Sequence, residues 1–287
     1  MSSAVDRLVR STDVAVSEAG RLADAVDQMY NDELDVIVVR RALDPPRLER
    51  VGEYLDRGDV DPGWARPNER MPIEDIQVLG TDTPATPTYS APTGASLDSY
   101  LDSADRHRSA TEGLFDADFN VCDEFRRVLG QFAGGRAVDI AVADDGRQYV
   151  PFTIRRLVDG RQIGLHHDYH YPLSLYSQLA PKLDTRTLIS FVVTLRRPEA
   201  GGELFVYAVT PDTPDPPKMP NGFQWDLEAV ERRFDWTSFE TNPGDLFLLA
   251  SGRCLHRIGK VEGPRARVSM GGFLALDKAD SRVLYWS

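Results

Sequence analysis

The stretch Gly164-Leu165-His166-His167-Asp168-Tyr169-His170 sets a histidine and a carboxylate two residues apart. In a β-strand, side chains at positions i and i+2 point to the same face, so His166 and Asp168 can reach one point in space. Two imidazoles and one carboxylate on one face of a metal ion form the ligand set of non-haem Fe(II) sites. The stretch therefore predicts a metal site that still needs one histidine from elsewhere in the chain.

Downstream of this stretch one histidine remains. The chain has five histidines, and after His170 only His256 follows, within Cys254-Leu255-His256-Arg257-Ile258. We therefore expect His166, Asp168 and His256 to be the metal ligands. His167 points to the opposite face and is expected to be structural or exposed, whereas His170 shares the parity of Asp168 and is a candidate for touching substrate or replacing a ligand.

A basic strand, Arg265-Ala266-Arg267-Val268-Ser269, comes after the distal histidine. The order His166-x-Asp168, His256 and then Arg267-x-Ser269 resembles that of the iron(II)- and 2-oxoglutarate-dependent dioxygenases. The resemblance runs from about Tyr149 to about Leu276. It includes Gly201-Gly202-Glu203-Leu204, which is similar to a strand entry of that family, and Asn242-Pro243-Gly244-Asp245-Leu246-Phe247, which is similar to the turn and strand that precede the distal histidine.

The resemblance implies two cofactors and a reaction. Fe(II) would keep three positions open, of which the cosubstrate 2-oxoglutarate takes two and dioxygen one. Decarboxylation of 2-oxoglutarate to succinate and carbon dioxide is coupled in the family to hydroxylation of an unactivated C–H bond. Halogenating relatives carry a small residue at the position of Asp168 to leave room for halide, so the carboxylate favours hydroxylation.

Further residues are candidates for binding the cosubstrate and the substrate. The planar fork of arginine matches the far carboxylate of 2-oxoglutarate, and Arg267 with Ser269 is the first choice. Arg265 shares the parity of Arg267 and is the alternative. Additional hydrogen bonds to 2-oxoglutarate are assigned to Ser190 and Thr194. The substrate is expected to meet Arg155 or Arg156, of which one should face the cavity and hold a carboxylate, together with Tyr169 and His170.

After Gly134-Gly135 the sequence changes to short β-rich runs separated by turn residues, which is typical of two facing sheets rolled into a jelly-roll. We therefore expect a mainly β protein, a double-stranded β-helix (jelly-roll, cupin-like) core flanked by helices. The runs are Ala137–Val142, Tyr149–Leu157, Gln162–Asp168, Thr187–Leu195, Glu203–Val209, Trp236–Glu240, Asp245–Ala250, Cys254–Val261, Arg267–Leu276 and Val283–Trp286.

The N-terminal part reads mainly as helical. Ala4–Tyr30 has an imperfect helical pattern, Val36–Val39 is a short buried strand, and Leu43-Asp44-Pro45-Pro46 opens a helix that runs to about Leu55. Two more helices are expected over Leu97–Leu114 and Asn120–Phe132. We expect one domain over residues 1–287, with a mostly helical part at 1–135 and the jelly-roll core at 136–287. The Pro-rich segments Thr81–Ser96 and Pro211–Gly222 are candidate loops near the active site.

Composition excludes some partners. A formal net charge of −12 argues against a nucleic-acid partner, which needs a basic face. The two cysteines, Cys122 and Cys254, are too few for a secreted disulfide framework and fit a reducing cytoplasm. The N-terminal residues lack the features of a signal peptide, and no apolar run reaches the length of a membrane span. The expected partners are therefore a small-molecule substrate, 2-oxoglutarate and dioxygen, and the oligomeric state is left open.

Three functions are compatible with the sequence. The leading one is hydroxylation of a small molecule, an amino acid or a specialised metabolite. The first alternative is a prolyl- or aspartyl-type hydroxylase of peptides or proteins, which an open groove at the barrel mouth would favour. The second alternative is a cupin-like sensor that binds metal without turnover, and formation of succinate would separate it from the other two.

Overall fold

The structure is a computed structural model that describes residues 7–57, 77–79, 94–168, 178–220, 222 and 224–287. Its larger sheet is mixed and has nine strands. Strand β5 (Thr153–Leu157) pairs with the first half of β14, and β3 (Gln77–Leu79) pairs with β5. The other strands lie in the order β1 (Ser11–Ala15), β2 (Val36–Arg40), β11 (Leu246–Leu249), β7 (Ile189–Arg196), β14 (Arg267–Leu276), β15 (Arg282–Trp286) and β4 (Ala137–Ile140).

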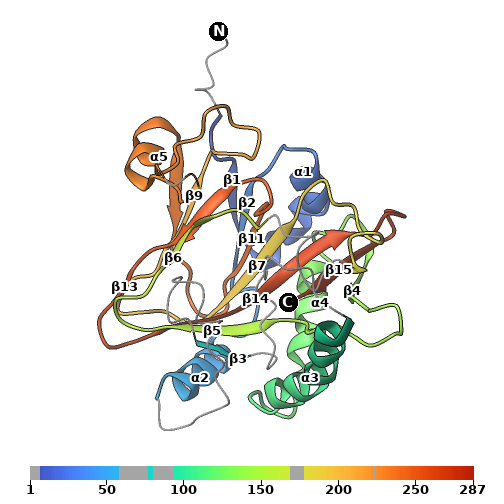
Figure 1. Ribbon diagram of the computed structural model, residues 1–287. Coiled ribbons are helices and arrows are strands. Elements are labelled where there is room, and N and C mark those ends of the chain that lie inside the picture. Colours follow the sequence, from blue (N-terminus) through green and yellow to red (C-terminus); the bar gives the residue numbers. More distant parts are fainter. Residues whose placement is uncertain (1–6, 58–76, 80–93, 169–177, 221, 223) are drawn as a thin grey trace.

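The smaller sheet has four strands and faces the larger one. Its order is β10 (Trp236–Phe239), β9 (Leu204–Tyr207), β12 (Leu255–Ile258) and β6 (Ile163–His166). A two-stranded ribbon of β8 (Ala200–Gly201) and β13 (Val261–Glu262) extends it. The two facing sheets form the jelly-roll, or double-stranded β-helix, that the sequence predicts (Figure 1).

Helices cover the outer faces of both sheets. In Figure 1, α5 lies beside β9, well away from α2, α3 and α4. Helix α2 approaches β7 closely, because a Cβ atom at Gly52 would lie only 2.8 Å from the carbonyl oxygen of Leu195. The helices are η1 (a 3-10 helix, Val16–Leu22), α1 (Ala25–Tyr30), α2 (Pro45–Asp56), α3 (Gly94–Glu112), α4 (Val121–Leu129) and α5 (Leu227–Arg233).

Alternation along the strands of the larger sheet divides the core into two layers. On β2, Ile37 and Val39 pack outward into the cluster formed with α1, α2 and α4. Val36 and Val38 point inward and pack against residues of the smaller sheet, including Val206. Because alternate side chains point to opposite faces, both faces of this strand are buried in apolar surroundings. The inner layer lies between the two sheets, where the predicted metal ligands must also lie.

The predicted runs match the strands well, with one correction. Each run contains or overlaps a strand, and Arg267–Leu276 has the observed bounds. The prediction of helix over Ala4–Tyr30 is wrong for the first described residues, because Ser11–Ala15 is a strand, whereas Val16–Leu22 is a 3-10 helix and Ala25–Tyr30 is α-helical. Strand β1 pairs in parallel with β2, and Asp13 binds Arg40 across that pairing. Tertiary pairing has overridden a weak local pattern.

Both parts of the chain contribute to the larger sheet. Strand β2, from the N-terminal part, pairs with β11 of the core, so we propose that the two parts fold as one domain. Among the described residues, no helix combines the length and the apolar character that crossing a bilayer requires.

Candidate metal centre

His166 and His256 lie directly opposite each other on neighbouring strands of the smaller sheet. His256 of β12 pairs with His166 at the end of β6, and their rings lie 4.2 Å apart. The register shifts between this pair and the next, because Ile258 pairs with Ile163. Two residues of β6 therefore oppose one of β12, which is a β-bulge. The bulge lets both Ile163 and His166 face the space between the sheets, although they are three residues apart.

Each histidine is held so that one ring nitrogen is free for a metal. His166 Nδ1 donates to the carbonyl oxygen of Gly164 at 2.7 Å, and His256 Nδ1 donates to that of Cys254 at 3.0 Å. A carbonyl oxygen only accepts, so Nδ1 carries the hydrogen and Nε2 of the neutral ring keeps its lone pair. A backbone partner on Nδ1 is the usual arrangement for histidines that bind metals through Nε2.

Asp168 lies just beyond the end of β6 and completes the group. Its carboxylate oxygens lie 3.4 Å from His166 Nε2 and 3.5 Å from His256 Nε2. The three ligand atoms all lie within 4.8 Å of one another. The backbone nitrogen of Asp168 donates to the carbonyl oxygen of Ser251 at 3.0 Å. Two imidazole nitrogens and one carboxylate at this spacing fit a divalent metal ion such as Fe(II).

Two serines position the carboxylate of Asp168. Ser190 Oγ, on β7, donates to Asp168 Oδ2 at 2.5 Å and lies 2.5 Å from Ser251 Oγ. Sequence reasoning placed Ser190 with the cosubstrate and missed Ser251. Their contact joins residues far apart in the sequence, so no local pattern could indicate it.

The electrostatics of the three residues favour an ionised carboxylate. Burial alone would raise the pKa of Asp168, but the neighbouring imidazoles of His256 and His166 outweigh it and hold that pKa well below its ordinary value. Burial lowers the pKa of His166, but Asp168 outweighs burial and raises it. A metal ion would be bound by the neutral imidazoles and the ionised carboxylate.

The structure separates the two arginine candidates for the cosubstrate. Arg267 is only 6% exposed, and its Nη1 donates to Ser269 Oγ at 2.8 Å. Burial, and then the neighbouring Arg155, lower the pKa of Arg267 to about 10, so the guanidinium stays charged at neutral pH. Arg265 is exposed and donates to the carbonyl oxygen of Pro198. Within the described part of the chain, Arg267 has no carboxylate partner, which leaves its charge for a ligand.

The glycine pair of Gly201-Gly202-Glu203-Leu204 makes room for this arginine. Both glycines have a positive φ, +70° and +73°. A Cβ atom at Gly202 would lie 3.1 Å from Arg267 Cδ. Thr194 lines the same small cavity as Gly202 and Arg267, and its hydroxyl lies 2.5 Å from that of Thr241.

The adjacent Arg155 and Arg156 point to opposite faces of β5. Arg156 donates to Asp56 Oδ1 of α2 at 3.3 Å, on the outer side of the larger sheet. Arg155 pairs with Ser269, so it lies on the same face as Arg267. Tyr169 and His170, the other substrate candidates, lie outside the described residues.

His167 faces away from the metal ligands, as its parity predicts. Its Nε2 lies 3.1 Å from the carbonyl oxygen of Val209, and its ring packs edge-on against Trp225. Burial lowers the pKa of His167 to about 4, so the ring is neutral at neutral pH. Lys218, in the Pro-rich segment 211–222, lies over Trp225. The described part of that segment is thus linked to His167 through Trp225.

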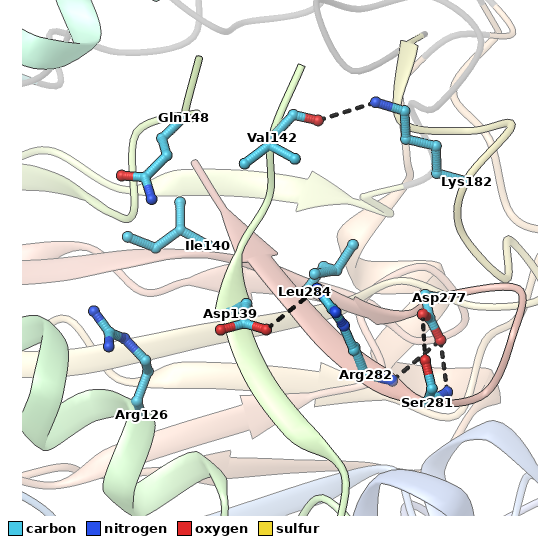
Figure 2. A pocket seen from close by; sticks show the side chains of 10 residues that line it. All are labelled: Arg126, Asp139, Ile140, Val142, Gln148, Lys182, Asp277, Ser281, Arg282 and Leu284. Carbon is cyan, nitrogen blue, oxygen red and sulfur yellow. Dashed lines mark hydrogen bonds and ion pairs between the residues drawn. The ribbon is translucent and has the colours of Figure 1, made fainter. Parts of the chain in front are cut away.

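A separate cavity lies on another part of the molecule. A cavity of about 590 Å³ opens between β4, β15 and α4, as Figure 2 shows. Arg282 lies 3.7 Å from Asp139 within it, and Lys182, on its rim, is paired with Asp144 at 2.7 Å. None of the site residues predicted within the described part of the chain lines this cavity. Its size therefore does not mark the functional site.

Comparison with known proteins identifies a matching family model and solved structures with a similar fold. A protein-family model described as "Carrier-protein-independent halogenase WelO5" matches residues 8–287. No curated protein matches the chain. Among solved structures, an N-substituted L-amino acid dioxygenase from Burkholderia ambifaria AMMD is similar, with 16% identity, a TM-score of 0.54 and coverage of 91% of each chain.

A second structure of that enzyme, in complex with alpha-KG, is also similar. It has 15% identity and a TM-score of 0.53, and the match covers 91% of this chain and 90% of the other. At this level of identity, the two similarities show a shared fold.

Proposed function

The chain belongs to the family of the carrier-protein-independent halogenase WelO5, within the iron(II)- and 2-oxoglutarate-dependent oxygenases, and from this membership we propose that it hydroxylates an unactivated C–H bond of a small molecule. Fe(II) and 2-oxoglutarate are its cofactors. The proposed iron ligands are His166, Asp168 and His256. The proposed substrate is an amino acid or a specialised metabolite, and the family's description as carrier-protein-independent favours a free substrate over one attached to a carrier.

The observation that carries hydroxylation is the carboxylate of Asp168. Its ion-pair distances to both imidazoles and its hydrogen bond from Ser190 support its assignment as the third protein ligand. A ligand that is held in place in this way leaves no vacant protein position for a halide. Hydroxylation is therefore favoured over halogenation, although the family takes its name from a halogenase.

The other residues of the site have proposed roles in binding and orientation. Bound iron would supply the centre at which 2-oxoglutarate and dioxygen react. The Nδ1 hydrogen bonds fix the rotation of both imidazole rings, so Nε2 of each points to the same place. Arg267 and Ser269 bind the far carboxylate of 2-oxoglutarate, and Thr194 lines the cavity beside them. The apolar cluster between the sheets, with Val206 and Ile258, would keep water from that side of the site.

Halogenation is the second candidate, because the matching family model is that of a halogenase. A direct test uses the metal-loaded protein with 2-oxoglutarate, oxygen and a panel of free amino acids, N-acyl amino acids and specialised metabolites, with chloride or bromide present. We expect succinate together with a product that gains one oxygen atom. If the wild-type protein formed a halogenated product, the proposed function would be halogenation and not hydroxylation.

The same assay separates catalysis from metal binding alone. A protein that binds iron and 2-oxoglutarate but forms no succinate with any compound would be a sensor, not an oxygenase. The matched control is Asp168→Ala, which keeps both histidines and should form no hydroxylated product.

A further inference from the structure

Two arginines share the inner face of the barrel beside the metal ligands. Arg155 of β5, Ser269 of β14 and Thr194 of β7 are direct partners across three adjacent strands. Directly paired residues project to the same side, so these three side chains form a row on one face. Arg267 lies two residues before Ser269 on β14 and therefore joins the same face. Leu157, two residues after Arg155, packs in the layer between the sheets, which confirms that this face points inward.

Arg155 lies on the same face of the larger sheet as Arg267, and its charge contributes to lowering the pKa of Arg267. Arg155 is partly buried, and it has no hydrogen-bond or ion-pair partner within the described part of the chain. Its neighbour Arg156, on the other face, is paired with Asp56. Among the described residues, Arg155 is thus the member of this adjacent pair that has no counterion.

When iron and 2-oxoglutarate are bound, the opposite charges of the proposed site balance without the charge of Arg155. The two positive charges of Fe(II) and the one of Arg267 are matched by the carboxylate of Asp168 and the two carboxylates of 2-oxoglutarate. A further partly buried cation at the same face is costly unless an anion accompanies it. The remaining component of the reaction is the substrate, so the substrate is the natural source of that anion.

We propose that Arg155 binds a carboxylate of the substrate, and that the substrate class of this enzyme is therefore small free monocarboxylates, such as N-acyl amino acids. This inference rests on the proposed hydroxylase function and deepens it. A planar guanidinium binds a carboxylate through two parallel hydrogen bonds, which fixes orientation as well as position. The substrate carboxylate then sets which carbon lies nearest the metal.

The experiment compares matched pairs of ligands. The protein is loaded with Mn(II) in place of iron, so that no turnover occurs, and with 2-oxoglutarate. Calorimetry then measures the binding of N-acetyl-L-amino acids and of the corresponding uncharged carboxamides. Arg155→Gln removes the charge-assisted, bidentate contact. Its affinity for the carboxylates should therefore be about 10- to 100-fold weaker than that of the wild-type protein. Arg155→Lys keeps the positive charge but lacks the planar guanidinium, so its affinity for the carboxylates should fall less than that of Arg155→Gln.

Two control measurements give the result its meaning. Arg156→Gln, one residue away on the outer face, should bind the carboxylates as the wild-type protein does. The affinity for 2-oxoglutarate alone should stay within about threefold in Arg155→Gln, well short of the tenfold that corresponds to 1.4 kcal/mol. In Arg155→Gln the preference for carboxylate over carboxamide should largely disappear.

Several outcomes overturn the inference. Equal binding of carboxylate and carboxamide by the wild-type protein does so, as does binding of no carboxylate in the panel while 2-oxoglutarate binds normally. A loss of 2-oxoglutarate affinity in Arg155→Gln would reassign Arg155 to the cosubstrate. In all three cases hydroxylase activity can still be present, whereas absence of succinate formation with every compound would remove the proposed function itself.

Discussion

The two faces of strand β7 are buried to a similar extent but differ in chemistry. The outer face carries Phe191 and Val193, at 1% and 0% exposure, packed under the helices. The inner face carries Ser190 and Thr194, at 8% and 3%. Burying polar groups costs free energy unless they are paired, so burial alone does not explain the inner face. The polar residues of that face contact the proposed metal ligand Asp168 or line the cavity of Arg267. The comparison therefore separates positions that stabilise the fold from positions that serve the site.

Removal of a proposed metal ligand should have the largest effect and tests whether the inner face serves the site. His166→Ala, Asp168→Ala and His256→Ala each leave two protein ligands, which hold Fe(II) poorly, so iron-dependent formation of succinate should be abolished. The fold should survive, because the change is at the inner face. Iron content after dialysis and succinate formation are the measurements, with circular dichroism as the control for folding. Full iron occupancy and turnover in any one variant would remove that residue from the ligand set.

A substitution on the outer face should lower the stability of the fold and leave metal binding intact. Phe191 packs against Phe125 at 4.4 Å between ring centroids, and truncation of a buried phenylalanine costs about 3–5 kcal/mol. Phe191→Ala should lower the free energy of unfolding by that amount, measured by denaturant titration. Below the unfolding transition, iron and 2-oxoglutarate affinities per folded molecule should match the wild type. A loss of metal affinity in the folded protein would show that the two faces are not separable.

Ser190 tests whether the inner face positions the carboxylate. Ser190→Ala removes the hydrogen bond to Asp168 Oδ2, and loss of such a partner of a metal ligand lowers metal affinity by about 10- to 100-fold. Mn(II) titration followed by calorimetry measures this. Thr194→Val is the matched control, since Thr194 lies on the same face of β7 but contacts Thr241. Equal effects of the two substitutions on metal affinity would argue against a specific role for Ser190.

The cosubstrate arginine gives a smaller effect. Arg267→Lys keeps the charge but loses the planar fork, so the affinity for 2-oxoglutarate should fall about tenfold, which is about 1.4 kcal/mol. Metal affinity should be unchanged. Arg265→Lys is the control, because Arg265 is exposed and contacts Pro198. A loss in Arg265→Lys with none in Arg267→Lys would transfer the role to Arg265.

The sequence predicted those features that depend on local periodicity. The strand Arg267–Leu276 and the shared face of His166 and Asp168 follow from alternation over a few residues. Strand β1 was missed because it is held by pairing with β2, not by its own pattern. The choice between Arg155 and Arg156 needed the pairing of β5 with β14, which a single sequence does not contain.

Long-range contacts explain the other omissions. Ser251 reaches Ser190 across sixty-one positions of the chain, and nothing near Ser251 in the sequence marks it. The bulge between His166 and Ile163 also depends on the partner strand β12. The three residues that the structure brings together as candidate metal ligands were therefore predictable, and the serines that contact them were not.

The smallest expected effect belongs to His167, which is adjacent to the proposed metal ligand His166 and points to the opposite face. His167→Ala removes a hydrogen bond to the carbonyl oxygen of Val209 and a ring contact with Trp225. That carbonyl oxygen keeps its bond from the backbone nitrogen of Leu255, so no buried acceptor is left unpaired. The cost should then be about 1 kcal/mol of stability, the net value of one ordinary hydrogen bond. Iron affinity and 2-oxoglutarate consumption should stay unchanged.

Comparison of His167→Ala with His166→Ala tests the register of β6 most directly, because a slip of one residue would exchange the faces of the two side chains. Iron binding and denaturant titration give the iron affinity and the free energy of unfolding for each of the two variants. The structure predicts loss of iron with little loss of stability in His166→Ala, and a small loss of stability with normal iron in His167→Ala. If the two variants exchanged these results, His167 would be the ligand, and the inward assignment of Asp168 would have to change with it, since the two residues are adjacent and alternate.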